Sequence, residues 1–132
     1  MRCAHLGLVA LVATAGCRLG PEPIMPAAAL HPRGAEVTLD TVGGELVGEL
    51  LALRSGVMVI RTESPERLLA VSFSVISEGS AEPIGHFRPR DLRGTTLQTL
   101  RLTSRYPQGI DAGLESALLR EYGLSRLEVL AE

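Results

Sequence analysis

The chain has 132 residues, of which 45% are hydrophobic and 21% charged, so its length allows one domain of ordinary size and excludes two well-buried cores. Thirteen basic and fifteen acidic side chains give a formal net charge of −2. This balance offers no field of one sign that would indicate nucleic acid as a partner. All thirteen basic residues are Arg, which we interpret as the bias of a GC-rich genome rather than a binding feature.

The N-terminus has the pattern of a secretory signal peptide. Arg2 supplies one positive charge, and residues 6–15 (LGLVALVATA) form a run without charge or Pro. Ten residues are too few to cross a hydrocarbon layer of ~30 Å as a helix. A basic start, a short apolar centre and small residues at its end are typical of an export signal.

The end of this run, Thr14-Ala15-Gly16-Cys17, resembles a bacterial lipobox. The resemblance implies cleavage after Gly16 and attachment of lipid to Cys17. It implies an exported protein anchored in a membrane, on the periplasmic or outer-surface side, with residues 1–16 as the signal peptide. Cys3 would leave with the signal, so no disulfide within one chain is expected.

Two alternatives remain open for this region. Residues 13–15 (ATA) also match the small-x-small pattern of ordinary secretion, which would release a soluble protein that begins at Gly16. Alternatively, the start is wrongly assigned, and the apolar run is a buried helix of a cytosolic protein.

Residues 17–34 predict a Pro-rich tether that would begin at the lipid-anchored Cys17. Four Pro residues occur between positions 18 and 34, without a regular apolar period. Proline favours extended backbone, so this segment reads as a semi-rigid spacer between the anchor and the domain.

Strand patterns then follow, because apolar and polar residues alternate from position 35. Gly and Ser turn signals separate the expected strands. We predict strands at 35–40, 45–54 and 57–62, a long strand at 67–77, a loop at 79–83 and a short edge strand at 84–88.

These strands favour closure into a small barrel over residues 35–90, because a short open sheet buries little. The stretch 37–60 resembles the core of SH3-like barrels of the Sm-like type: a strand ending in a Gly turn precedes a bent strand around Gly48. The Sm signature for RNA, an Asp and Asn loop with a later Arg-Gly or Lys-Gly turn, is missing, so no nucleic-acid partner is expected.

Residues 91–132 predict a mainly helical extension packed on the barrel. Residues 111–122 have helical spacing, Asp111 is a candidate N-cap, and Gly123 can end the helix in the left-handed conformation. The segment 95–104 is ambiguous and favours helix, which would complete a helical hairpin. Residues 126–130 are either a last short strand or a fraying helix. The predicted class is therefore α+β.

No catalytic constellation is visible, and the sequence predicts a protein that is not an enzyme. His86 is the single histidine after the tether, without Cys or His partners for a metal, and no cofactor is expected. An alternative is a small envelope hydrolase or ligand-binding lipoprotein in which His86 meets a Ser and an acid. We interpret Glu45 and Glu49, like the pair Glu63 and Glu66, as solvated surface acids.

Two segments are candidates for partner binding. Arg88 and Arg90 begin a basic concentration that continues through positions 93, 101 and 105. It either contacts anionic headgroups or an envelope polymer, or pairs locally with acids. Arg105 and Tyr106 either form an exposed binding corner or belong to a tight turn.

The leading hypothesis is an exported, lipid-anchored, non-catalytic binding or scaffolding module; the rival is a cytosolic Sm-like RNA-binding or regulatory module.

Overall fold

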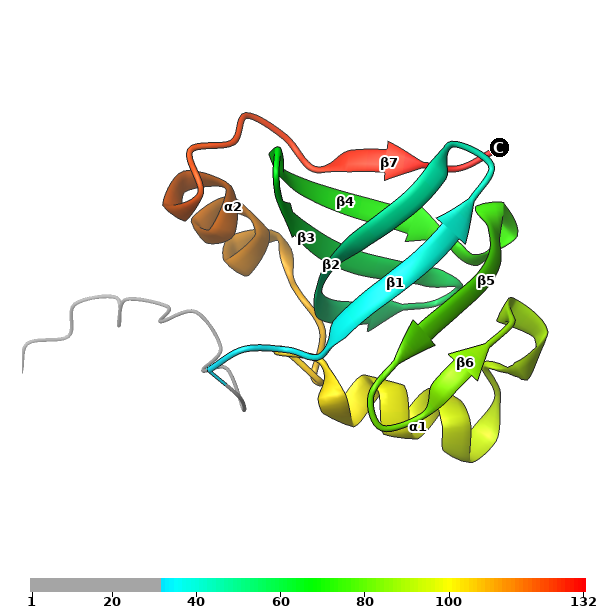
Figure 1. The fold of residues 1–132 in the computed structure, drawn as a ribbon. Coiled ribbons are helices and arrows are strands. Elements are labelled where there is room, and N and C mark those ends of the chain that lie inside the picture. Colours follow the sequence, from blue (N-terminus) through cyan, green and yellow to red (C-terminus); the bar gives the residue numbers. More distant parts are fainter. Residues whose placement is uncertain (1–31) are drawn as a thin grey trace, which may run out of the picture.

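The computed structural model describes residues 32–132, which form one seven-stranded sheet with two α-helices, so the mixed α+β class is confirmed (Figure 1). The strand order is β6-β5-β1-β2-β3-β4-β7. Neighbouring strands are antiparallel except β4 and β7, which are parallel. The strands are β1 (Glu36–Thr41), β2 (Gly44–Arg54), β3 (Val57–Glu63), β4 (Glu66–Ser72), β5 (Ile76–Ala81), β6 (Gly85–Phe87) and β7 (Glu128–Leu130).

The first three strands lie where the alternation predicted them. In β1, Val37 and Leu39 are fully buried, while Glu36 and Asp40 are exposed on the other face. Alternate residues of a strand point to opposite faces, so one face of this part of the sheet is apolar and the other is polar. The turn between β1 and β2 needs Gly44, whose φ of 110° is left-handed.

The expected long strand at 67–77 is wrong. β4 ends at Ser72, and a 3₁₀ turn, η1 (Phe73–Val75), redirects the chain into β5. The Ser72 hydroxyl accepts a hydrogen bond from the Ser74 N–H, and the Phe73 N–H donates to the Gly56 carbonyl at 2.8 Å. As a result β5 pairs with β1, and much of the expected loop at 79–83 is strand. The edge strand β6 agrees with the prediction for 84–88.

The sheet is open, so the predicted barrel is not confirmed. Closure would require the outer edges of β5 and β4 to meet, but β6 occupies the edge of β5 and β7 occupies the edge of β4. Two apolar clusters form on the two faces of the sheet instead. Cluster 1 includes Val37, Leu39, Leu50, Met58, Ile60, Leu69, Val71, Ile76, Phe87, Leu92 and Leu100. Cluster 2 comprises Leu51, Ala52, Val59, Leu68, Tyr106, Ile110, Leu114 and Leu118.

Both predicted helices are present, as α1 (Gly94–Thr103) and α2 (Ala112–Glu121). The Asp111 side chain accepts the Leu114 N–H, and Gly123 follows with a left-handed φ of 66°, as predicted. The expected helical hairpin is not formed: α1 adds Leu100 to cluster 1, while α2 adds its leucines to cluster 2. Figure 1 shows α1 along β6 and α2 beside β3 and β4. Within residues 32–132, neither helix is long and apolar enough to cross a membrane.

The loop between the helices crosses from one face to the other at a bulge in β2. The pairing of β2 with β3 shifts register between Leu50 and Ala52. There the Leu50 carbonyl accepts the Arg105 N–H at 3.1 Å, and the Leu51 carbonyl accepts the Tyr106 N–H at 2.8 Å. A bulge frees backbone groups from the ladder, and this one attaches the loop.

Candidate functional site

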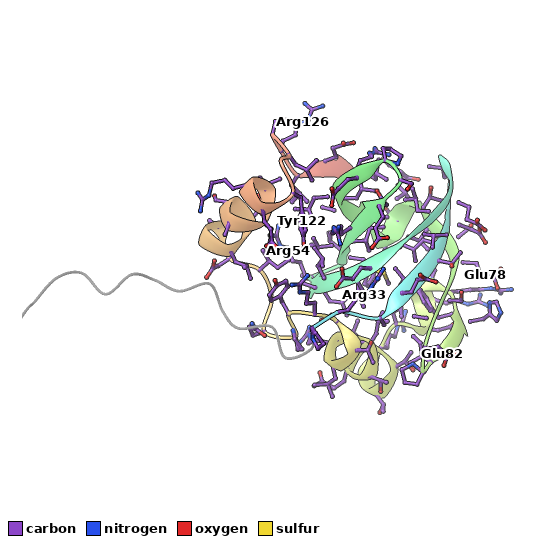
Figure 2. All side chains as sticks on the ribbon, turned by 60° about the vertical axis from the view of Figure 1, so that its left-hand side comes forward. Arg33, Arg54, Glu78, Glu82, Tyr122 and Arg126 are labelled. Carbon is purple, nitrogen blue, oxygen red and sulfur yellow. The ribbon has the colours of Figure 1, made fainter. Side chains whose placement is uncertain are left out.

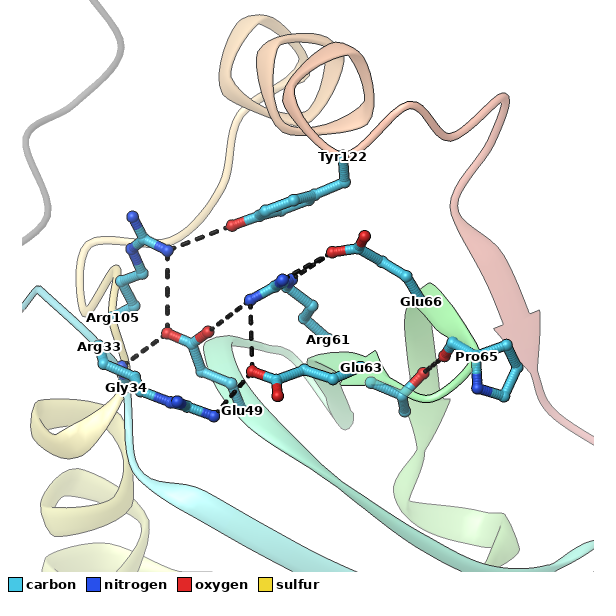
Figure 3. Close-up of polar contacts among 10 residues, drawn as sticks. Arg33, Gly34, Glu49, Arg61, Glu63, Pro65, Glu66, Arg105 and Tyr122 are labelled. Carbon is cyan, nitrogen blue, oxygen red and sulfur yellow. Dashed lines mark hydrogen bonds and ion pairs between the residues drawn. The ribbon is translucent and has the colours of Figure 1, made fainter.

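Glu49 of β2 is the buried centre of a charged network (Figure 3). Its side chain is 2% exposed, whereas Glu45 and Val47 on the same face of the strand are exposed. One carboxylate oxygen accepts the Gly34 N–H at 2.8 Å. Arg61 and Arg105 approach the carboxylate at 3.6 and 3.9 Å. A buried carboxylate is tolerated when positive charges and a backbone N–H surround it in this way.

Arg61 of β3 connects this carboxylate with the turn that follows β3. Its guanidinium lies 2.6 Å from Glu66 and 3.7 Å from Glu63, and it covers the ring of Tyr122 at 4.3 Å from the centroid. Burial alone would lower the pKa of Arg61, but the hydrogen bond to Glu66 and the neighbouring carboxylates raise it. Arg61 is therefore a fixed positive charge.

Arg105 and Tyr122 attach the helical segment to the same network. The Arg105 Nη1 donates to the Tyr122 hydroxyl at 3.2 Å. Burial raises the pKa of Tyr122 above its ordinary value, so this hydroxyl stays protonated at neutral pH. The network thus joins β2, β3, the loop after α1 and the end of α2.

The chain enters the domain through this network. The Ala35 N–H donates to the Thr103 carbonyl at 2.9 Å, and the Leu50 N–H donates to the Ala35 carbonyl at 2.8 Å. Only glycine fits at position 34, because a Cβ there would collide with the backbone carbonyl of Leu50. Arg33 adds an exposed ion pair with Glu63 at 2.9 Å. We conclude that the network fixes the N-terminal segment against β2.

A hollow of about 430 Å³ lies beside the network. Its lining includes Arg33, Glu49, Thr62, Glu63 and Arg67. Acid–base catalysis needs a carboxylate that is free to exchange a proton with a substrate. Glu49 is instead held by two guanidiniums and a backbone N–H, so the arrangement suits a structural role.

Of the two alternatives for Arg105 and Tyr106, the exposed binding corner is wrong and the tight turn is confirmed, because the Gly109 N–H donates to the Tyr106 carbonyl at 2.9 Å. Tyr106 is 5% exposed and its ring packs in cluster 2, because its backbone N–H is held by β2. Arg105 belongs to the Glu49 network. The interpretation of Glu49 as a surface acid is also wrong, since residues distant in sequence cover it. The role of the half-buried Arg61 in the network was likewise not predicted. The sequence indicated only that Arg61 lies in a strand.

Arg88 and Arg90 are exposed; Arg88 directly precedes the short 3₁₀ turn η2 (Pro89–Asp91), and Arg90 lies within it. Asp91 accepts the Arg88 N–H at 3.0 Å and lies 3.9 Å from the Arg90 Nε. Local pairing with Asp91 therefore exists, but the Arg90 side chain remains 70% exposed. Both residues stay candidates for partner contact. Gly16 and Cys17 lie outside the described residues.

His86 and Ser80 are directly opposite each other on β6 and β5. Together with Asp40, Glu45 and Glu78 they line a hollow of about 210 Å³ on the polar face. The hollow thus gathers a His, a Ser and acids, as the hydrolase alternative requires, but in the described part of the chain no hydrogen bond of the kind that activates a serine joins Ser80 to His86. Residues 32–132 contain no group of His, Cys, Asp and Glu suited to a metal ion.

Comparison with known proteins identifies no relative: no protein-family model, curated protein or solved structure matches the chain.

Proposed function

We propose that the protein is exported, is anchored to a membrane by lipid on Cys17, and serves as a non-catalytic binding or scaffolding module of the cell envelope. The observation that carries this proposal is the short apolar run that ends in Ala-Gly-Cys, followed by a Pro-rich segment. A tethered domain needs a firm attachment where the tether joins it. The Glu49 network supplies such an attachment at Gly34.

The polar half of one sheet face supports a binding role. Helix α2 covers this face only over cluster 2, and β1, β5 and the start of β2 present exposed polar side chains beside it. Figure 2 shows Glu78 projecting from β5 on the side away from α2. An uncovered sheet face of this kind can receive another macromolecule without change in the core.

For the fold, we propose that β1–β5 are an opened version of the SH3-like barrel. The support is the continuity of cluster 1, which gathers residues from β1, β2, β3, β4 and β5 on one face. The Val42 N–H also donates to the Val75 carbonyl at 3.2 Å, which links the end of β1 to η1.

Mass spectrometry of the mature N-terminus in a bacterial host tests the proposed anchor. We expect a chain that begins at Cys17 and carries lipid, because the lipobox-like residues precede this cysteine. Cys17→Ala should abolish labelling by a fatty-acid analogue and release the protein from membranes. Cys3→Ala is the matched control and should leave labelling unchanged, because Cys3 leaves with the signal.

An unlipidated chain that begins at Gly16 would instead indicate a secreted protein. A chain that retains Met1 and stays in the cytosol would overturn export altogether.

A further inference from the structure

Four exposed arginines lie in the stretch that contains η2 and α1, which also contributes two buried leucines to cluster 1. They are Arg90 in η2, Arg101 in α1, and Arg88 and Arg93, which directly precede η2 and α1. Between positions 88 and 103 the sequence holds a single acid, Asp91. We call these four residues the basic strip. Its excess of positive charge suits a surface that carries many negative charges.

An exposed leucine lies at the end of the same helix. Leu102 follows Arg101 and is 53% exposed, whereas Leu100, on the inner side of α1, is fully buried. Leu102 lines an open hollow of about 520 Å³ together with Ala35, Pro83, Arg33 and Glu82. Leu102 thus lies next to Arg101 in the chain and shares its hollow with Arg33 and Glu82; an exposed apolar side chain beside arginines is typical of surfaces that rest in a headgroup layer.

Acidic residues gather on the opposite face of the sheet. Glu36 and Asp40 alternate with Val37 and Leu39 of cluster 1, so their side chains point away from that cluster. The register places Asp40 opposite both Glu45 and Glu78. We call Glu36, Asp40, Glu45 and Glu78 the acidic face; none of the four has an ion pair within residues 32–132. The basic strip, by contrast, lies on elements whose Leu92 and Leu100 pack into cluster 1.

The tether joins the domain beside α1. Ala35 is hydrogen bonded to Thr103, the last residue of α1, and Arg33 lines the hollow that contains Leu102. The fifteen residues from Cys17 to His31 can reach up to about 45 Å at ~3 Å per residue, so the tether length permits α1 to reach the membrane.

We propose that η2 and α1 dock the tethered domain on the headgroups of an anionic lipid bilayer. The basic strip and Leu102 face the lipid, and the acidic face is turned away and left free for a partner. This inference rests on the proposed anchor at Cys17. A tether raises the local concentration of the domain at the membrane, so a modest attraction is enough to orient it.

The chain offers two convenient probes for a test. It contains no Trp, and Cys17 is the only cysteine once residues 1–16 are removed. Both core clusters lie within the described residues 32–132, so this removal leaves them intact. Residues 17–132 are coupled through the Cys17 thiol to a maleimide lipid in vesicles. Coupling in this way makes the docking test independent of lipidation in cells.

Leu102→Trp and the matched control Val47→Trp then each provide a single tryptophan. Val47 is 46% exposed and lies on the same strand face as Glu45. In phosphatidylcholine vesicles that contain phosphatidylglycerol and brominated lipid, we expect several-fold stronger quenching at position 102 than at 47. The difference should disappear without phosphatidylglycerol and at high salt. Equal quenching at both positions would overturn the proposal.

A charge-matched pair of variants tests the basic strip itself. The double variant Arg93→Gln, Arg101→Gln should lower the ratio of docked to undocked protein by about 10-fold or more. Arg120→Gln with Arg126→Gln removes the same charge near α2 and should leave the Leu102→Trp signal nearly unchanged. An equal loss in both pairs would show a response to net charge alone, and orientation would be refuted even if Cys17 proves to be lipidated.

Discussion

At the scale of single residues, Glu49 holds three separate parts of the chain together. It contacts the backbone of Gly34, the guanidinium of Arg61 and the guanidinium of Arg105. Removing one member of a buried ion pair leaves the other charge uncompensated, which is more damaging than the net value of the pair suggests. A change at this one carboxylate should therefore affect the whole domain.

We expect Glu49→Ala to lower the free energy of unfolding by about 3–5 kcal/mol, because it leaves the Gly34 N–H without its acceptor and Arg105 without a carboxylate, while Arg61 keeps Glu63 and Glu66. Glu49→Gln keeps an acceptor for that N–H and should cost about 1–3 kcal/mol. Urea denaturation measures both. Glu66→Ala is the control: its side chain is 38% exposed, so its ion pair with Arg61 is worth about 0–1 kcal/mol. Equal losses for Glu49→Ala and Glu66→Ala would contradict the assigned role of Glu49.

At the scale of elements, an ion pair joins the last strand to its neighbour in the sheet. β7 is a short edge strand that pairs with β4. The Glu128 carboxylate of β7 accepts hydrogen bonds from two nitrogens of Arg67 of β4. This hydrogen bonding lowers the pKa of Glu128 below its ordinary value. A carboxyl whose pKa is lower in the folded state stabilises that state above its unfolded pKa, and the contribution disappears as pH falls through the folded pKa.

We therefore expect Glu128→Gln to destabilise the protein at pH 7 and to differ less and less from wild type as the pH falls below about 4. Urea denaturation across a pH series measures the difference. Glu132→Gln, at the exposed C-terminus, is the control and should show no such convergence. A constant difference between Glu128→Gln and wild type from pH 7 to pH 3 would count against the ion pair as the cause.

The elements that the sequence predicted are those whose signals are local. Alternation in β1 and the Asp111 cap with Gly123 around α2 require only neighbouring residues. β5 was missed because Gly79, followed by Ser80 and then Pro83, indicates a loop. Gly79 is small for another reason: a Cβ there would collide with the Phe87 ring of β6.

Features that depend on contacts between distant residues could not be predicted. The burial of Glu49 depends on Arg61, Arg105 and Gly34, which come from three separate segments. The open sheet depends on β7 reaching the edge of β4, and sequence periodicity does not specify which edge a short strand joins. The same applies to Tyr106, which packs inward because β2 is bulged where the loop crosses it.

At the scale of the whole molecule, one sheet separates two apolar clusters that share its strands. β2 supplies Leu50 to cluster 1 and Leu51 to cluster 2, and β3 and β4 are shared in the same way. Loss of packing on one face removes support from strands that the other face needs. The two clusters should therefore unfold together in one cooperative transition.

Leu50→Ala and Leu118→Ala test this coupling from the two faces. Both side chains are at most 1% exposed, so each truncation should cost about 2–5 kcal/mol of unfolding free energy. Leu102→Ala, on the outer side of α1, should change the unfolding free energy by less than about 0.5 kcal/mol.

Two probes of denaturation test whether the clusters unfold together. Far-ultraviolet circular dichroism reports on the strands and helices, and the intrinsic fluorescence of Tyr106 and Tyr122 reports on cluster 2, in and against which they lie. In each variant the two probes should give the same denaturation midpoint. If Leu50→Ala lowered the midpoint of one probe and left the other in place, the clusters would be independent units. The shared strands would then not transmit stability between the faces.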